Sequence, residues 1–442
     1  FRRSSENYKR WHRRNRRLSK KERRRRVGCT GAASFNGDPG ISGVIASSEA
    51  AGFLEQCLQV QAHELIERFD QAIRGFLLKL DAGIRADVTG LFAKALPTPL
   101  VCRFLKYSPF QHDTWAKVDA LGDEMREQYW REVHPDWLRK DSPDLNEVVG
   151  RLLGARRPRA AFFSVHFALD ELETSRLKRL LHEIGTCDAE APGTHRIDAH
   201  HLSEALDIFQ NRAGVSEEET ARLEFLFITA LEHTSHGIPN LEKQIDRSPA
   251  LFVQVLALLF RRKDGGEDPP EWGVKDRERR SALATAAFRL LENIKRIPGT
   301  DASRKIDKDK LRAWVKEAQA LCAMYGRAEI GEQRIGQILS AAPVGTDGIW
   351  PCQEVRSVLE ECGTPDMATG VQVGVHNSRG MHSRAEGGAQ ERSLAEKYRS
   401  YSRKLSFECP YVADLVLGIA ESYDRQAEMW DSEDAVRRRL DH

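Results

Sequence analysis

The sequence predicts an all-α protein built as an irregular α-α superhelix of stacked helical pairs, a solenoid-like architecture. Along residues 47–442, apolar residues recur at the i, i+3, i+4, i+7 spacing of amphipathic helices. Outside the linkers, no segment alternates with the period of two that a half-buried strand requires. Short polar loops separate the helices, which favours paired and stacked packing. No strict repeat length is present, so the pattern does not establish a consensus TPR, HEAT or ankyrin array.

Composition supports a folded protein without a membrane span. The chain has 442 residues, of which 40% are hydrophobic and 30% charged, enough apolar side chains for a substantial core. The longest apolar run, residues 252–260, is nine residues long and includes Gln254. A membrane helix needs about 18 or more such residues. We therefore expect no membrane association.

Charge divides the chain into a basic N-terminal segment and an acidic body. Residues 1–26 hold eleven Arg, three Lys and two Glu, which leaves a net charge of −10 on the rest of the chain. Residues 27–46 are rich in Gly and Ser. We expect 1–46 to be a disordered tail or a segment foreign to the domain, and the chain, which begins with Phe1, to be a piece of a larger protein. The alternative is nucleic-acid binding through residues 1–26, because clustered Arg neutralises phosphates.

Local signals place the helices in order. The apolar spacing predicts a long helix over 49–82, then a helical array to residue 275 and a C-terminal helical region over 276–442. Ser216 with Glu219 forms a capping box, and Ser248 before Pro249 marks another helix start. Further helical stripes follow over 281–291, 311–325, 335–339, 355–362, 394–405 and 412–423. Trp115, Trp130 and Trp137 are expected to pack in the core between helices.

Residues 371–394 are the segment that packing explains least, and we predict a loop there. The segment contains four glycines and the polar residues His376, Asn377, Arg379, His382, Arg384 and Glu391. Glycine permits close approach of another group, and Arg grips carboxylates or phosphates with its forked donors. The following helix begins near residues 390–391, so free backbone N–H groups can face an anion. These residues, together with Trp350, are therefore the predicted binding site.

Two other interpretations of this loop remain open. In the first, Asn377, Arg379 and Glu391 simply hold a long connection in place, because the glutamates of the segment are ready partners for Arg. In the second, the loop is an unfamiliar enzyme site built from His376, Ser378, Arg379, His382 and Glu391. Trp350 likewise either packs against the core, with Pro351 opening a helix, or marks a partner site if it is exposed.

The sequence gives no support for a metal, a cofactor or a known catalytic motif. His195, His200 and His201 lie near Asp198 and Cys187, but adjacent histidines on a helix point about 100° apart and rarely share a metal. Residues 63–67 read HELIE and lack the second His of a zinc motif. Residues 299–311 lack the calcium ligands of an EF-hand and instead offer Asp307 or Asp309 as a helix cap. P-loop, dinucleotide-binding and nucleophile-elbow motifs are absent.

Eight scattered cysteines contain no C-x-x-C pair, which excludes a zinc ribbon and a thioredoxin-like site and is typical of a reducing cytoplasm.

A resemblance covers about residues 50–442. The stretches RIPGTD, IGQILSAAPVGTDGIWPC and GVHNSRGMHSRAEGGAQERSLAEKYRSYSRKL resemble the C-terminal helical region of large uncharacterised bacterial multidomain proteins. That family has no established activity, so the resemblance implies no catalytic residue or cofactor. It implies a sensor or scaffold role, related to defence. We therefore expect a non-enzymatic, cytoplasmic interaction or sensing module whose partner is a protein or another domain of a larger parent chain.

Overall fold

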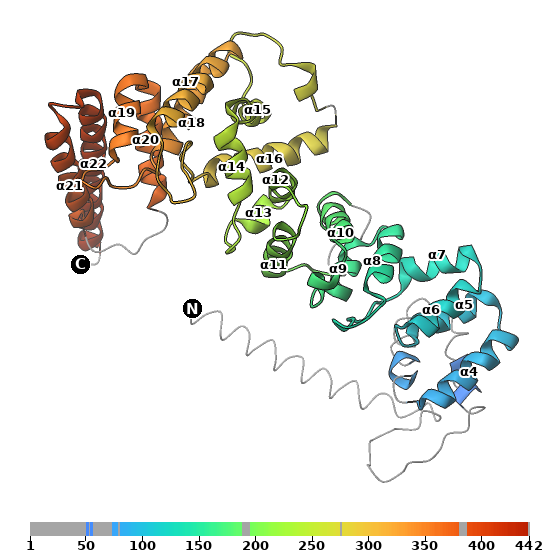
Figure 1. Ribbon diagram of the computed structural model, residues 1–442. Coiled ribbons are helices and arrows are strands. Elements are labelled where there is room, and N and C mark those ends of the chain that lie inside the picture. The colour runs from blue at the N-terminus through green and yellow to red at the C-terminus, as the bar shows by residue number, and fades with distance from the viewer. Residues whose placement is uncertain are drawn as a thin grey trace. The chain divides into compact units, whose positions relative to one another are not determined.

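The computed structural model describes residues 50–52, 54–55, 73–77, 80–187, 195–274, 276–379 and 387–440 (Figure 1). These residues are mainly helical and contain no β-strand; an isolated antiparallel bridge joins Thr300 and Ile306. The all-α prediction is therefore confirmed. The basic segment 1–46 lies outside the described residues. Contacts divide the chain into two compact units, Phe1–Phe104 and Leu105–His442.

In the first unit, α4 (Ala82–Ala95) is followed by α5 (Thr98–Tyr107), which runs past the end of the unit. The Asp81 carboxylate accepts a hydrogen bond from the Gly83 N–H at 2.8 Å and caps α4. Phe92 and Phe104 pack edge to face with ring centroids 4.9 Å apart. The predicted helix over 49–82 is too long at its C-terminal end, because Leu80 lies in a bend and Asp81 already caps the next helix.

The second unit begins with a cluster of short helices and an aromatic core. Its elements are α6 (His112–Asp119), α7 (Asp123–Glu132), α8 (Leu145–Gly154), α9 (Pro158–Val165), η1 (Leu169–Glu171) and α10 (Thr174–Thr186). Trp115 and Trp130 are buried, as predicted, with ring centroids 5.8 Å apart. Trp137 is 60% exposed, so the core prediction was wrong for it. The segment that carries it is held on α9, where the Leu138 N–H donates to the Ser164 carbonyl at 2.8 Å, and the indole lies outside against Phe167.

The next helices are α11 (Ala199–Gln210), α12 (Glu217–Leu226), α13 (Ile228–Leu231), α14 (Pro239–Arg247) and α15 (Pro249–Leu259). Both predicted caps are confirmed: Ser216 and Glu219 form the capping box of α12, and the Ser248 hydroxyl accepts from the Leu251 N–H.

A buried carboxylate on α12 caps the neighbouring helix α14. Glu224, which is fully buried, accepts hydrogen bonds from the backbone N–H groups of Asn240 at 3.2 Å and Leu241 at 2.7 Å. His236 lies between Glu224 at 3.1 Å and Asp207 at 2.7 Å. Burial alone would lower the pKa of His236, but the hydrogen bonds to Glu224 and Asp207 outweigh it, and the pKa is raised. This network fixes α11, α12 and α14 to one another.

The C-terminal half contains η2 (Pro270–Trp272), α16 (Arg277–Asn293), α17 (Lys308–Met324), α18 (Ala328–Leu339), α19 (Gln353–Cys362) and α20 (Pro365–Ser378). The predicted cap of α17 is confirmed, since the Asp307 carboxylate accepts from the N–H groups of Asp309 and Lys310.

Glycines bring α18 and α20 into backbone contact. A Cβ atom built on Gly370 would lie 1.9 Å from the Gln333 carbonyl oxygen, and one built on Gly336 would lie 2.1 Å from the Met367 carbonyl oxygen. Side chains at these positions would therefore hold the helices apart. The prediction of a loop over 371–394 was too broad: α20 continues to Ser378, and α21 begins at Ala389. The glycines at 370 and 374 serve close helix packing rather than a flexible connection.

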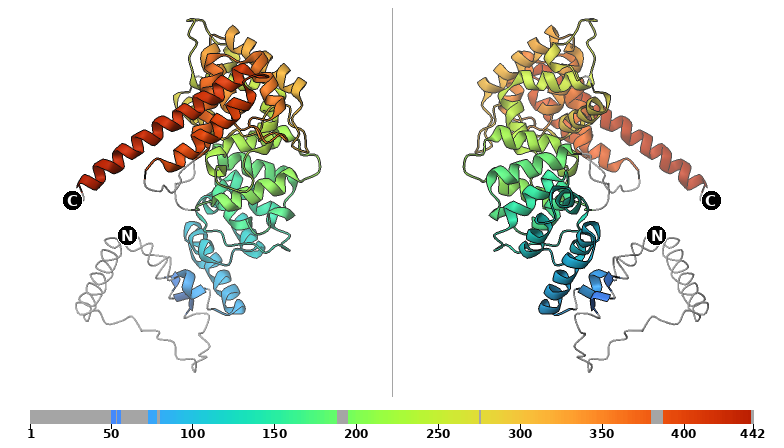
Figure 2. Two further views of the ribbon diagram at one scale, coloured as in Figure 1. Left: turned by 90° about the vertical axis from the view of Figure 1, so that its left-hand side faces the viewer. Right: turned by 90° about the vertical axis from the view of Figure 1, so that its right-hand side faces the viewer.

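The last two helices, α21 (Ala389–Leu405) and α22 (Pro410–Leu440), form an antiparallel hairpin. Glu360 of α19 caps α22 by accepting from the N–H groups of Tyr411 and Val412, at 3.2 and 3.1 Å. The C-terminal end of α22 projects past the start of α21 (Figure 2). Among the described helices, none combines the length and apolar character that a membrane span requires.

Candidate functional site

The residues of the sequence-predicted site lie on two helices and their connection. His376 and Asn377 belong to the last turn of α20, Arg379 follows that helix directly, and Glu391 lies in the first turn of α21. The other two members of the predicted set, His382 and Arg384, lie outside the described residues.

Arg379 is turned inward and has a partner within the chain. Its Nη1 lies 3.3 Å from Oε1 of Glu391, whose side chain is 1% exposed, and its guanidinium lies 5.5 Å from the centre of the Tyr423 ring. The other carboxylate oxygen of Glu391 is buried and has no hydrogen-bond partner among the described residues. This geometry matches the interpretation in which Arg379 and Glu391 hold the helix ends together.

His376 also packs into the helical hairpin. Its ring centroid lies 4.6 Å from that of Tyr423, and burial, with a smaller effect from Arg379, lowers its pKa. The Ser378 hydroxyl donates to the Val375 carbonyl of its own helix at 2.8 Å. Within the described residues no hydrogen bond joins Ser378 and His376, so this pair does not form a nucleophile and base.

The start of α21 already has anionic partners from α22. The Gly388 N–H donates to Asp431 at 2.9 Å, the Gly387 N–H donates to Asp434, and Arg392 pairs with Asp431 at 2.6 Å. The N–H groups of Gly387 and Gly388, which directly precede α21, therefore bind carboxylates of the same chain.

Trp350 belongs to the core, and its predicted place in a contact region needs correction. The side chain is 8% exposed, and its indole N–H donates to the Ala342 carbonyl at 2.9 Å. The ring packs edge to face on Tyr398, with centroids 5.7 Å apart. Because Trp350 is enclosed and its donor is satisfied, it has little surface to offer a partner. The helix after it begins at Gln353 rather than at Pro351.

The histidines weighed as metal ligands do not converge. His195 is 9% exposed, and burial lowers its pKa to about 4. His200 faces Glu204 at 3.8 Å, while His201 stacks near His166.

Elsewhere in the described chain, ligand atoms of His112, Asp144 and Glu147 lie within 4.8 Å of one another. Glu147 there already pairs with Arg151 at 2.6 Å, so one ligand is engaged, and such partly exposed acidic groups are common without a metal.

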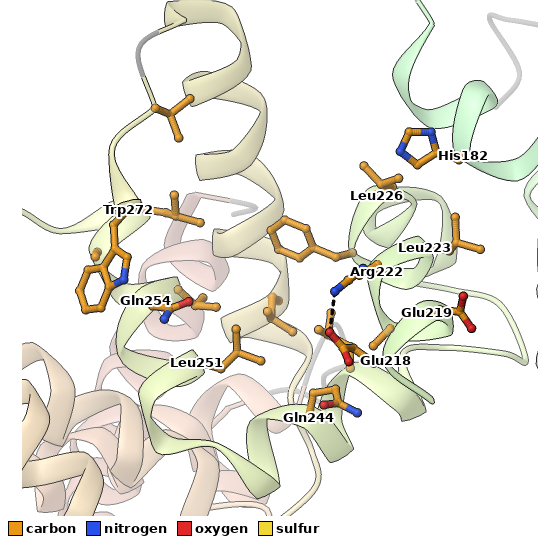
Figure 3. Close-up of a pocket in the computed structure, with 18 of the residues that line it drawn as sticks. His182, Glu218, Glu219, Arg222, Leu223, Leu226, Gln244, Leu251, Gln254 and Trp272 are labelled. Carbon is orange, nitrogen blue, oxygen red and sulfur yellow. Dashed lines mark hydrogen bonds and ion pairs between the residues drawn. The ribbon is translucent and has the colours of Figure 1, made fainter. Parts of the chain in front are cut away.

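A different site, which the sequence interpretation missed, is a groove between α10, α12, α14, α15 and α16. Its cavity volume is about 1050 Å³, which lies at the upper end of the usual range of small-molecule pockets, roughly 300–1,000 Å³. Leu251 and Gln254 of α15 line one side, Leu223 and Leu226 of α12 the other, and Trp272 closes one end (Figure 3).

Helix α15 explains why this groove is apolar. Gln254 is its single polar residue in the sequence PALFVQVLALL. A helix that is apolar on every face is normally covered on every face. Here Phe252, Val253 and Leu256 are buried in the chain, whereas Leu251 and Leu258 remain partly exposed and line the groove.

The wall that carries Trp272 is held by an ion pair between buried Arg327 and half-buried Asp268. Arg327, which is 1% exposed, binds both carboxylate oxygens of Asp268 at 2.7 Å and donates to the Phe260 carbonyl at 2.8 Å. Trp272 packs on Tyr325, with ring centroids 4.7 Å apart. The charged stretch between α15 and α16 is thus an ordered wall of the groove.

One arginine on the rim of the groove forms no ion pair with a described residue, whereas the carboxylates of the groove are all paired. Its three carboxylates are paired within the chain, Glu218 with Arg222 at 2.6 Å, Glu219 with Lys178, and Asp268 with Arg327. Hydrogen bonds from Lys178 and the Ser216 cap hold the pKa of Glu219 at about 2, so it stays ionised. Arg280, also on the rim, is exposed and forms no ion pair with any described residue.

We compared the chain with family models, curated proteins and solved structures. None matches it. The function of this protein therefore has to be inferred from its own geometry.

A signal for the groove was present in the sequence. Residues 249–259 are almost wholly apolar and show no polar face, although the neighbouring helices are amphipathic.

Proposed function

We propose that this chain is a non-enzymatic interaction module, in which the groove between α10, α12 and α14–α16 receives an apolar helical segment of a protein. The proposal rests above all on α15, which is apolar on every side but partly uncovered. A groove lined by helices suits an amphipathic helix, whose apolar side chains recur at i, i+3 or i+4, and i+7. The cavity volume of about 1050 Å³ is large enough to receive several such side chains.

The proposal includes two features expected from the sequence: membership of a larger bacterial protein with a sensing or defence role, and a cytoplasmic location. Cys187, Cys322, Cys352, Cys362 and Cys409 are free thiols, which suits a reducing compartment. The stacked, irregular superhelix is the architecture that we propose for presenting the groove.

Binding of an apolar fluorescent dye tests the groove. Anilinonaphthalene sulfonate, an apolar anion, is expected to bind the wild-type chain at the groove, beside Arg280, when the chain is dilute enough that no second molecule competes for the groove. Gln254→Trp fills the groove from an exposed position, so it should remove one dye site without lowering the melting temperature. Phe407→Glu is the matched control, because Phe407 is 96% exposed and does not line the groove. Equal dye binding by all three proteins would refute the proposal.

A further inference from the structure

The C-terminal end of α22 carries two exposed apolar side chains on one face of the helix. Met429 is 47% exposed and Val436 is 55% exposed. They lie seven residues apart, on the same face of the helix, and Glu433 lies between them on that face. The opposite face carries Tyr423 and Ala427, which are buried in the hairpin.

Exposed apolar residues on a projecting helix point to a partner. α22 packs on α19, α20 and α21 within the chain, and its end extends beyond α21 (Figure 2). The groove requires an amphipathic helix, and this helix end is one. We propose that the C-terminal end of α22 from a second copy of this chain occupies the groove. In the resulting pair, each copy inserts its helix end into the groove of the other. This inference rests on the proposed function of the groove.

Charge complementarity supports this occupant. Glu433 is exposed and forms no ion pair with a described residue, and Arg280 on the groove rim has none either. When Met429 and Val436 enter the groove, Glu433 enters with them and meets the rim. A carboxylate there pairs with Arg280, whereas a neutral or positive residue leaves that arginine without a counter-charge.

A closed pair explains how so small a stripe can hold two chains together. One helix end contributes few apolar side chains, and a single contact of this size is weak. Two reciprocal contacts act together, because formation of the first raises the effective concentration for the second. Symmetric pairs are also the commonest form of self-association.

Sedimentation of the full chain tests the inference. Wild type is expected to be a dimer, and both Gln254→Trp and the Met429→Glu/Val436→Glu variant are expected to be monomers. When the two variants are mixed, the intact helix end of the first enters the intact groove of the second. Only one of the two contacts can then form, so the mixture should associate more weakly than wild type but more strongly than either variant alone. Phe407→Glu is the control and should dimerise like wild type. Persistence of the dimer in either variant alone, or association in the mixture no stronger than in either variant alone, would overturn the reciprocal insertion of helix ends.

Charge reversal tests the contact without touching an apolar residue. Glu433→Arg and Arg280→Glu are both surface changes, and each is expected to raise the dimer dissociation constant about tenfold or more. The double reversal should restore it, and failure to restore it refutes the pairing.

The dye experiment separates failure of this inference from failure of the proposed function. A chain that remains monomeric but binds the dye in the groove has a binding groove whose occupant is another molecule. A chain that neither dimerises nor binds the dye at that place contradicts both proposals.

Discussion

Replacing Gly370 with alanine tests whether glycine sets the distance between α18 and α20. The new Cβ atom would lie 1.9 Å from the Gln333 carbonyl oxygen, 2.7 Å from its carbon and 2.9 Å from its Cα. All three are backbone atoms of α18, so no side-chain rotation relieves the overlap. The helices must separate by more than about 1 Å to restore van der Waals contact.

The magnitude follows from two opposed effects. Alanine is favoured over glycine inside a helix by about 0.5–1 kcal/mol. Overpacking of a closely packed contact costs about 1–3 kcal/mol, and the short distances here place Gly370 at the upper end. The expected net loss in the free energy of unfolding is about 2 kcal/mol. A loss of about 1 kcal/mol lowers the melting temperature by roughly 2–4 °C in a domain of 150–250 residues, and by less in a larger one. A loss of about 2 kcal/mol should therefore lower the melting temperature of this larger unit by at most about 4–8 °C.

The assay compares three variants by denaturant unfolding and by hydrogen exchange of α18 and α20. Gly374→Ala should be milder, since the two nearest atoms to its Cβ are side-chain atoms of Ser340, Oγ at 2.1 Å and Cβ at 2.7 Å, and the nearest backbone atom, the Gln337 carbonyl oxygen, lies at 3.1 Å. Gly154→Ala is the matched control, because this exposed residue ends α8 and no atom lies within 4 Å of the new Cβ. If Gly370→Ala unfolds like Gly154→Ala, glycine does not set the packing distance.

Three further predictions concern buried charge. Arg379→Ala leaves its buried carboxylate partner uncompensated and should lower the free energy of unfolding by about 3 kcal/mol, whereas Arg392→Ala removes an exposed, solvent-screened pair and should cost much less; equal losses in denaturant titrations would contradict the bracing role. The pKa of His236 is raised above its ordinary value of 6.5. Protonated His236 therefore contributes fully to the free energy of unfolding below that pH, and this contribution is lost as pH rises through the pKa of the folded state. Asp207→Asn should make the free energy of unfolding depend less on pH between about pH 6 and 9. The pKa of His195 is lowered to about 4, so stability should fall by up to about 1.4 kcal/mol per unit as pH drops from 6.5 towards 4, and an unchanged slope in His195→Leu would refute this.

The fold class and several helix starts could be predicted because their signals are local. Ser216, Ser248 and Asp307 cap the helix that immediately follows each of them, so the residue and its effect lie within four positions of the sequence. Apolar spacing likewise reports a helix without reference to its neighbours.

Predictions failed where the sequence pattern has two physical meanings. Gly374 was predicted to lie in a loop, but in the fold it and Gly370 allow α20 to lie close against α18. Trp137 read as core, yet the backbone hydrogen bond from Leu138 fixes its segment on the surface of α9. The groove escaped notice for a further reason: its lining residues lie between positions 175 and 290 and come together only through packing.

Capping between helices that are distant in sequence determines which charges remain free for a partner. Glu224 caps α14, Glu360 caps α22, and Asp431 accepts from the backbone at the start of α21. Part of the acidic charge of the chain body is therefore already engaged with helix N-termini, and less of it forms an acidic surface. At the groove rim the same internal pairing engages every carboxylate and leaves Arg280 without one. A net charge of −10 outside the basic segment thus coexists with a groove rim whose unpaired charge is positive, which is why we propose an exposed carboxylate, Glu433, as the partner of Arg280.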